Sequence, residues 1–367
     1  MKRVLTATGT VLGLLLIGLV VFFFWASSGR LSEAELTQTR QYSAASTTGS
    51  PDTLTVTTYN IGYLSGMTNN RPVVRSDSFL NANMERALQL LRKADADLIG
   101  FQEIDYDGGR SGYVHQLDTI GTRLGYAAAA QAVNWDKRYL PFPYGRPAVN
   151  FGQMLSGQSL LSRYPIQQHV RKVLSRPPQP FYRAAFYLNH LAQIAIVDLG
   201  GRPLAVMNLH LEAFDVATRE QQAREANALY DKLVAAGLPV LVLGDINSVA
   251  PASHSVLPPD QRRKFTDDET LPLLLDGTDL RSVFPDSTYQ AASPPATFPA
   301  NGPNRKIDHI FYPPALFEPV ARDIQCGGAP SPPSDHCAVT ASLRLRMSPA
   351  DWPAPDDRPR LDTLLAD

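Results

Sequence analysis

The sequence has few cysteines and no surplus of basic residues. The first shortage argues against a zinc site, and the second bears on nucleic-acid binding. Cys326 and Cys337 are the only cysteines among 367 residues, and no Cys or His cluster has the spacing of a zinc site. After Arg30 the chain carries 31 basic against 35 acidic side chains, a net charge of −4. Proteins that hold long nucleic acids usually have a basic surplus, because neutralised phosphates supply most of their affinity. The charge balance therefore counts mildly against a nuclease.

Two common enzyme motifs are also absent. The chain contains no G-x-S-x-G, the nucleophile turn of many serine hydrolases, and no G-x-x-x-x-G-K-[ST], the phosphate loop of many nucleotide hydrolases. Hydrophobic residues make up 44% of the chain, which is ample for one large core.

An uncharged apolar stretch lies at the N-terminus. Val4 to Trp25 would form a helix of roughly 33 Å, enough to cross the hydrocarbon core of a bilayer. Lys2 and Arg3 precede it, so the positive-inside rule keeps the N-terminus in the cytoplasm. The alternative is a signal peptide cleaved near Ala26, but the apolar run is longer than a usual signal h-region. We expect a transmembrane signal anchor over residues 1–25, and either alternative places the rest on the extracytoplasmic side, periplasmic or extracellular.

The remainder divides into three parts by composition. Residues 26–52 are small and polar without apolar periodicity, and we expect a flexible linker. Residues 53–346 alternate strand-like and helical patterns and form the predicted catalytic domain. Residues 347–367 are rich in proline and acid, and we expect a surface extension.

Within the central part, strands outnumber long helices. Many strands with two or three long helices fit a layered α/β domain. The predicted strands are Thr53–Tyr59, Leu98–Gln102, a hairpin of Ala192–Leu199 and Pro203–Leu209, then Pro239–Leu243, Lys306–Tyr312 and Ala338–Leu345; the predicted helices are Asn83–Ala94 and Val216–Ala236.

Polar side chains recur where these strands end. Any one of them has an ordinary reading as a turn residue, a cap or a satisfied core histidine. Together, strong apolar strands that deliver Asn, Glu, His and Asp at one end predict a site on the rim of a sheet. The residues are Asn60, Glu103, His210, Asp245, Asn247, Asp308, Asp335 and His336.

These residue types suit a hard divalent cation. Carboxylate and amide oxygens are the ligands that Mg²⁺ or Mn²⁺ prefers, and such a cation neutralises phosphate charge. A histidine beside a carboxylate can serve as a general acid or base. We therefore expect Mg²⁺ (or Mn²⁺) as a cofactor that could neutralise a bound phosphate.

Seven short motifs occur in an order that resembles the endonuclease/exonuclease/phosphatase superfamily. The resemblance covers roughly Thr53 to Leu345, and it implies a four-layer α/β/β/α sandwich with the site at one rim. That superfamily includes deoxyribonuclease-type nucleases, bacterial sphingomyelinases and inositol-polyphosphate 5-phosphatases. The motifs are TYNI at residues 58–61, FQE at 101–103, LLSRYPI at 160–166, NLHL at 208–211, GDIN at 244–247, KIDHIF at 306–311 and SDH at 334–336.

The resemblance also implies roles for the site residues. Glu103 corresponds to the principal metal ligand, with Asn60 and Asp335 completing or supporting the metal site. Asp245 corresponds to the group that orients or deprotonates the attacking water, and Asn247 to a phosphate contact. His336 and Asp308 resemble the superfamily's His–Asp pair, and His210 a second histidine beside the phosphate.

Two segments match no subfamily that we can identify, and a third is an aromatic loop. The polar stretch from Gly62 to Leu80 and the proline-rich segment between Asn247 and Lys306 would lie near the site rim and could set specificity. The aromatic loop from Tyr139 to Tyr144 could contact lipid, although such residues more commonly pack within the protein.

Three functions compete. The first is a membrane-tethered phosphodiesterase acting on a lipid-linked or small phosphodiester, and the second is an exported metal-dependent endonuclease. The third is a catalytically inactive binding module, which the intact residue set disfavours. The charge balance and the expected membrane attachment favour the phosphodiesterase. The expected partner is the membrane, which the protein would contact through its N-terminal helix. We also predict a disulfide between Cys326 and Cys337, because they are the sole cysteines and the exported location is oxidising.

Overall fold

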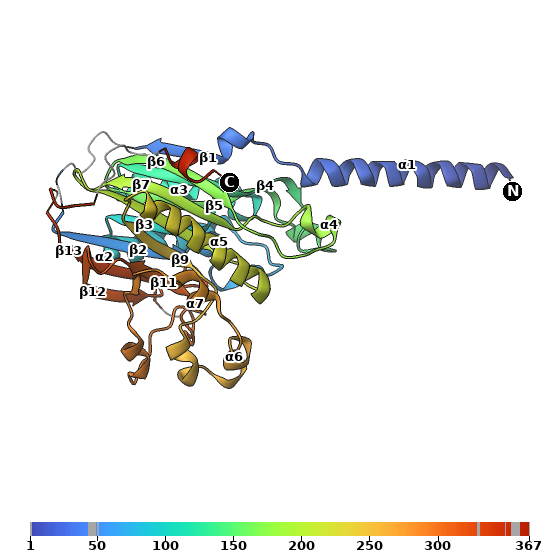
Figure 1. Ribbon diagram of the computed structural model, residues 1–367. Helices are drawn as coiled ribbons and strands as arrows, with labels where there is room; N and C mark the ends of the chain where they lie inside the picture. Colours follow the sequence, from blue (N-terminus) through green and yellow to red (C-terminus); the bar gives the residue numbers. More distant parts are fainter. Residues whose placement is uncertain are drawn as a thin grey trace.

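The computed structural model describes residues 2–42, 49, 51–328, 331–348, 350–353 and 360–366. Two β-sheets pack face to face and helices cover both outer surfaces (Figure 1). The predicted four-layer α/β/β/α sandwich is confirmed: α2 and α3 cover the seven-stranded sheet, and α5 and α7 cover the six-stranded sheet.

The strand order is β1-β4-β5-β3-β2-β13-β12 in the larger sheet and β10-β11-β9-β8-β7-β6 in the smaller one. The strands are β1 Thr37–Gln41, β2 Thr53–Asn60, β3 Leu98–Asp105, β4 Ala128–Leu140, β5 Gly152–Ser162, β6 Ile166–Val173, β7 Leu191–Asp198, β8 Pro203–His210, β9 Val240–Asp245, β10 Arg281–Ser282, β11 Asp308–Tyr312, β12 Phe317–Gln325 and β13 Ala338–Leu345. The α-helices are α1 Lys2–Ser27, α2 Asp77–Ala94, α3 Gln116–Leu124, α4 Phe181–Ala184, α5 Val216–Ala235, α6 Pro259–Lys264, α7 Thr270–Leu275 and α8 Leu361–Leu364.

Two pairs of neighbouring strands are parallel, one in each sheet. β2 runs parallel to β3, and β8 runs parallel to β9, whereas the other paired strands are antiparallel. The two pairs end at the same edge of the sandwich, since Asn60 at the end of β2 contacts Asp245 at the end of β9. We call this edge the carboxyl rim.

The core between the sheets follows from alternation along the strands. In β2, Leu54 and Val56 are fully buried and face the second sheet, where they join Leu241 and Leu243 of β9. Burying side chains of this size stabilises a fold by about 1.5–3 kcal/mol each. This packing fixes the distance between the sheets and so the width of the carboxyl rim.

The two long helices covering the sheets confirm the predicted ones, with one shifted boundary. α2 begins six residues before the predicted start, at Asp77, because the Ser76 hydroxyl accepts a hydrogen bond from the Phe79 N–H and caps the helix. The Asp215 carboxylate caps α5 through the Thr218 N–H, as the sequence predicts.

The predicted linker is wrong for part of its length. Thr37 to Gln41 form β1, which pairs antiparallel with the edge strand β4, and Arg40 forms an ion pair with Asp118 at 2.9 Å. The segment has no apolar alternation because β1 is an edge strand with mostly half-buried side chains. Residues 43–48 and 50 of the predicted linker lie outside the described residues.

The predicted surface tail is also wrong in part. Trp352 is buried and packs edge-on against Phe317, and its indole N–H donates to the Pro203 carbonyl at 2.9 Å. Leu361 and Leu365 are buried in the core beneath α5. Three well-spaced apolar side chains thus hold the segment on the sandwich, while residues 349, 354–359 and 367 lie outside the described residues.

α1 is long and apolar enough to be a candidate membrane span. The stretch from Arg3 to Ser27 contains no buried residue within its most apolar part, and the helix projects away from the sandwich (Figure 1). A signal sequence would have the same appearance.

Candidate functional site

The carboxyl rim brings all eight predicted site residues together. Asn60 is the last residue of β2, and its amide donates to Oδ2 of Asp245, the last residue of β9, at 2.9 Å. His210 ends β8 and pairs in register with Asp245. Gly244 permits this approach, because a Cβ there would lie 2.0 Å from the Leu209 carbonyl oxygen. Residues from both sheets therefore share one site.

Glu103 lies within β3, whereas the sequence placed it just after the strand. The pairing of β3 with β5 shifts register between Phe101 and Ile104, and Glu103 takes a left-handed backbone angle, φ +50°. Such a conformation is costly for a non-glycine residue and is common at functional sites. Its carboxylate lies 3.8 Å from Nε2 of His210 and 3.4 Å from the Asn60 amide.

His336 stands between two carboxylates. Its Nδ1 lies 3.0 Å from Oδ2 of Asp308, the first residue of β11, and its Nε2 lies 3.7 Å from Oδ2 of Asp245. Asp308 also pairs with Asp245 in the register of β11 and β9. The predicted His–Asp pair is therefore present, and it orients the far side of the ring toward Asp245.

Asp335 is linked to Glu103 by Asn69, a residue that sequence reasoning missed. The Asn69 amide donates to Oε2 of Glu103 at 2.8 Å and lies 3.4 Å from the Asp335 carboxylate. Gly62 makes room for Asp335, because a Cβ on Gly62 would lie 2.7 Å from its Oδ1. Asn69 belongs to the polar stretch after Asn60, which thus reaches the site as expected, although nothing in its sequence singles out this asparagine.

Asn247 is held at the rim by two hydrogen bonds. Its backbone N–H donates to Oδ1 of Asp245 at 3.0 Å, and its side-chain amide donates to the Leu211 carbonyl at 2.9 Å. Its φ of +53° is a second left-handed angle at the site. The loop after β8 therefore determines where this amide points.

A second layer of polar residues supports His210. His190 contacts the His210 carbonyl through Nδ1 at 2.8 Å and Glu212 through Nε2 at 3.1 Å. Tyr187 donates its hydroxyl proton to Glu212 at 2.8 Å. Sequence reasoning missed these residues, because His190 and Tyr187 precede β7 and carry no motif.

An aromatic side chain packs against His336, and a cationic side chain lies over that aromatic ring. The centre of the Phe298 ring lies 4.7 Å from the centre of the His336 ring. The Arg305 guanidinium lies over the Phe298 ring, 4.4 Å from its centre. Both come from the proline-rich segment between Asn247 and Lys306, which therefore borders the site as expected. Arg305 is half-buried and can meet an anion that enters the site.

Burial and crowded charges shift the pKa values of the site. Burial raises the pKa of Asp245 to about 7 and that of Asp335 to about 6, although His336 opposes both shifts. Burial would lower the pKa of His336, but the carboxylates of Asp308 and Asp245 outweigh it and raise the pKa to about 10. Burial lowers the pKa of His210 to about 3. At neutral pH His336 is thus cationic and His210 neutral.

The donor set fits a divalent cation. Four carboxylates, those of Glu103, Asp245, Asp308 and Asp335, converge within a largely buried rim, and the ligand atoms of Asp245, Asp308 and His336 lie within 4.8 Å of one another. Crowded buried carboxylates are costly without a compensating positive charge. Two of them, Asp245 and Asp335, have raised pKa values, first because they are buried and to a smaller extent because a neighbouring carboxylate repels their charge.

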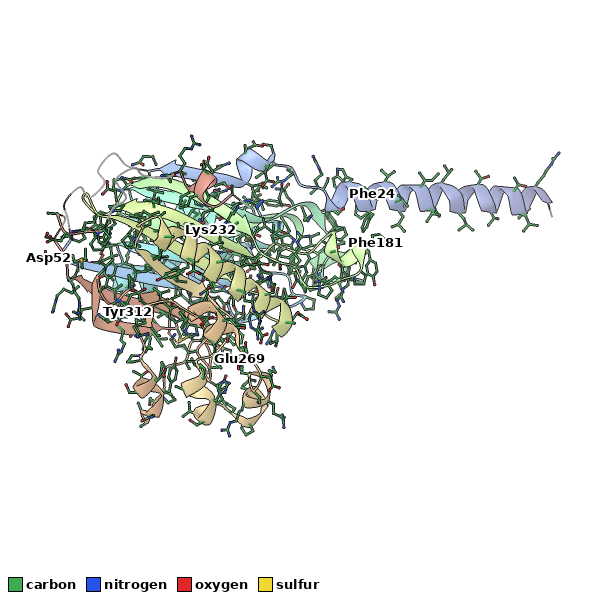
Figure 2. All side chains as sticks on the ribbon, in the orientation of Figure 1. Phe24, Asp52, Phe181, Lys232, Glu269 and Tyr312 are labelled. Carbon is green, nitrogen blue, oxygen red and sulfur yellow. A yellow bond between two sulfur atoms is a disulfide. The ribbon has the colours of Figure 1, made fainter. Side chains whose placement is uncertain are left out.

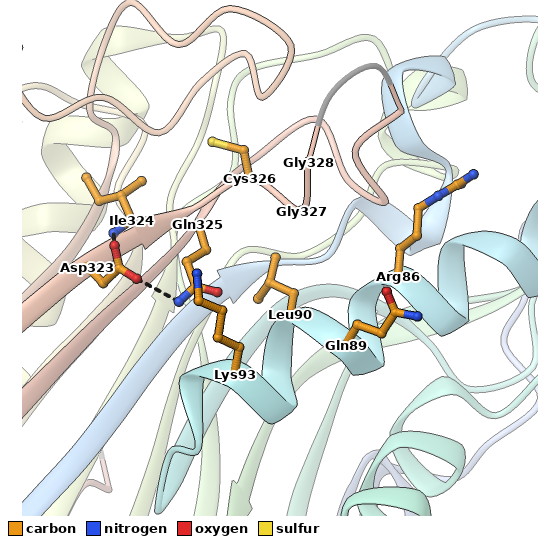
Figure 3. Close-up of a pocket in the computed structure, with 10 residues that line it drawn as sticks. All are labelled: Arg86, Gln89, Leu90, Lys93, Asp323, Ile324, Gln325, Cys326, Gly327 and Gly328. Carbon is orange, nitrogen blue, oxygen red and sulfur yellow. Dashed lines mark hydrogen bonds between the residues drawn. The ribbon is translucent and has the colours of Figure 1, made fainter.

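A pocket separate from the site is also present. It has a volume of about 370 Å³ and lies between α2 and the end of β12, near Leu90 and Gln325 (Figure 3). It contains none of the eight site residues. The candidate site is therefore the carboxyl rim and not this pocket.

The fold and the rim together define an α/β/β/α sandwich with a cluster of acidic and histidine side chains that could hold a metal ion, and the comparison with known families identifies it. The chain belongs to the Endonuclease/Exonuclease/phosphatase family, whose model matches residues 57–336. The enzymes of this family hydrolyse phosphoesters and generally depend on divalent metals.

One curated relative and two solved structures are informative. Inositol phosphosphingolipids phospholipase C of Saccharomyces cerevisiae is 29% identical over 102 residues, which cover 25% of this chain and 21% of that protein. An endonuclease/exonuclease/phosphatase from Beutenbergia cavernae has a TM-score of 0.54 at 19% identity, covering 80% of this chain and 72% of its own. The human Nocturnin catalytic domain with bound sulfate has a TM-score of 0.53 at 16% identity, covering 86% and 99%. The chain thus spans about a fifth of the curated relative, and the two structures share its fold.

Proposed function

We propose that this protein is a membrane-tethered phosphodiesterase that hydrolyses the headgroup phosphodiester of a lipid on the extracytoplasmic side, with Mg²⁺ or Mn²⁺ bound at the carboxyl rim. The observation that carries the proposal is the junction of His336, Asp308 and Asp245 beside Glu103 at the rim. It places a cationic imidazole next to a carboxylate that can accept a proton.

Asn60, Glu103 and Asp335 would hold the cation, as the family resemblance implies. Asp245, Asp308 and His336 are closer to one another, but Nδ1 of His336 is already engaged by Asp308. The bound cation would supply stabilisation of the charge that develops on the phosphate.

The remaining residues would handle protons and bind the phosphate. Asp245 would orient the attacking water and accept its proton, since its Oδ2 lies at the centre of the Asn60, His210 and His336 contacts. Cationic His336 would donate a hydrogen bond to a phosphate oxygen, with Asp308 fixing its ring. Neutral His210 and the Asn247 amide would contact other oxygens of the phosphate.

The lipid substrate class is supported by three observations. α1 is a candidate membrane span, the chain after Arg30 carries a net charge of −4, and the yeast relative is named as a phospholipase C. A domain that binds long DNA would favour a basic surface.

A panel of phosphoesters tests the proposal. Full-length protein in detergent would be assayed with and without Mg²⁺ against a phosphomonoester, a small diester, mixed phospholipid and sphingolipid micelles, and plasmid DNA. We expect cation-dependent release of a phosphorylated headgroup from at least one lipid class. Turnover of the phosphomonoester alone, or of the plasmid alone, would contradict the proposal.

A further inference from the structure

α1 leaves the sandwich at the carboxyl rim. β4 and β3 each pair antiparallel with β5, so β4 and β3 run in the same direction and end at the same edge. The last residues of β4 hold the end of α1: Lys137 donates to the Ser27 carbonyl at 2.7 Å, and the Arg138 N–H donates to the Ser28 carbonyl at 3.0 Å. Figure 2 shows Phe24 at this end and Asp52, which precedes β2, at the opposite end.

The end of α1 is packed against the domain. Ala26 is fully buried, and the Phe23 ring lies 5.5 Å from Phe186 and 6.0 Å from Phe181. Just after the helix, the Arg30 N–H donates to the Asp136 carboxylate at 2.7 Å. The direction of the helix is therefore set relative to the site, in place of the loose tether expected from the sequence.

Two rim segments beside this junction expose aromatic side chains. They are residues 137–150, which follow the middle of β4, and residues 176–190, which lead into β7; we call them the collar. Tyr144, Phe181 and Tyr182 of the collar are more than half exposed. Figure 2 shows Phe181 beside the end of α1, close to Phe24.

The collar carries basic side chains and no acidic ones. Exposed aromatics with nearby basic groups are the composition that proteins use at a bilayer surface, where rings lie at headgroup level and cations meet anionic lipids. The basic residues are Lys137, Arg138, Arg146, Arg176 and Arg183.

A third rim loop adds to this surface. Phe214 follows β8 and is 89% exposed, and the N–H of Phe214 donates to Glu212, whose carboxylate supports His190 beside the site. Exposed aromatics therefore lie on rim loops of both sheets, at the edge that holds the site residues.

We propose that the carboxyl rim faces the bilayer that α1 spans, with the collar lying in the headgroup region, so that a lipid headgroup enters the site from the membrane side. The choice of a lipid headgroup as the substrate rests on the proposed function. The geometry rests on α1, the collar and the strand directions.

A fluorescence measurement on the full-length protein tests this orientation. Phe181→Cys would be labelled with an environment-sensitive dye, since the two native cysteines are joined in a disulfide and do not compete for the label. Val234→Cys is the matched control, because Val234 is 46% exposed near the end of α5, which leads away from the rim. Both proteins would be reconstituted into vesicles of zwitterionic and anionic phospholipid carrying a nitroxide near the headgroup.

We expect the label at position 181 to be quenched at least about twofold more than the label at 234. Tyr144→Cys gives a second collar position if Phe181→Cys folds poorly. Equal quenching at collar and control positions would overturn the orientation, and so would release of the protein from vesicles by an alkaline wash. Quenching needs no turnover: strong quenching without lipid hydrolysis would contradict only the proposed function, and lipid hydrolysis without quenching would contradict only the orientation.

Discussion

His336 and Asp308 form the shortest of the contacts between a histidine and a carboxylate among the eight site residues, with Nδ1 of the ring 3.0 Å from Oδ2 of the acid. Both side chains are almost completely buried. Asp308 therefore keeps the proton on Nδ1 and points Nε2 into the site, toward Asp245.

Substitutions in this pair should separate chemistry from positioning. His336→Ala should lower kcat by about 10²-fold to 10⁴-fold, the usual contribution of a positioned acid or base. Asp308→Asn should lower kcat less, because the amide can still orient the ring but cannot stabilise its charge. Asp323→Asn, an exposed residue of β12, is the matched control and should retain full activity. A His336→Ala enzyme with more than a small fraction of wild-type kcat would refute the assignment.

Divalent cations should bind at Glu103 whether or not substrate is present. We expect titration calorimetry of the full-length protein in detergent to detect Mg²⁺ or Mn²⁺ binding that Glu103→Ala weakens at least about tenfold. Asp323→Asn again serves as control. Chelation should abolish hydrolysis and added Mg²⁺ should restore it. Unchanged turnover in excess chelator would show that hydrolysis does not depend on a divalent cation.

The pH dependence of kcat/KM should show an acid limb caused by Asp245. Burial raises the pKa of this carboxyl to about 7, so its base form is lost as the pH falls below neutrality. At limiting Mg²⁺, kcat/KM should therefore rise with pH and reach half of its plateau value near pH 7. Cation binding competes with protonation, and more Mg²⁺ should move the limb to lower pH. A profile that is flat from about pH 5 to 8 at limiting Mg²⁺ would contradict this role.

The bond between Cys326 and Cys337 is present, as predicted, and closes a loop that contains Asp335 and His336. Cys337 is buried, and its N–H donates to the Thr297 carbonyl at 2.8 Å. The double change Cys326→Ala and Cys337→Ala should lower the free energy of unfolding by roughly 2–3 kcal/mol, which calorimetry can measure. Alkylation without reductant offers a direct check: an intact mass with two added groups would show that the bond does not form in the isolated protein.

Local sequence patterns predicted a layered α/β domain with polar residues at the strand ends, and the family resemblance predicted the four-layer sandwich with the site at one rim. β2 is an alternating strand that ends in Asn60 and β9 is an apolar strand that ends in Asp245, and parallel neighbours bring such ends to one edge. The positions that were missed depend on tertiary packing. Asn69 reaches Glu103 across the rim from a polar loop, and β1 pairs with β4 through backbone hydrogen bonds and contacts of the Arg40 side chain with Gln131 and Asp118.

The expected linker and tail failed for the same reason. Composition marks residues 26–52 and 347–367 as polar or proline-rich, but a few well-placed side chains decide whether such a segment packs. Trp352 and Leu361 anchor the tail, and the two backbone N–H groups of Arg30 and Leu31 bind Asp136 at the start of the linker. A soluble version that began after Gln41 would lose β1, so the full-length protein is the better material for assays.

The most direct test of the central claim compares two substrates for one enzyme. Full-length protein in detergent would receive mixed phospholipid and sphingolipid micelles or plasmid DNA, at matched enzyme and Mg²⁺ concentrations, with His336→Ala as the inactive control. We expect Mg²⁺-dependent release of phosphorylated headgroup that is lost in His336→Ala, with little nicking of the plasmid. Rapid nicking of the plasmid without headgroup release would contradict it and make the protein a nuclease.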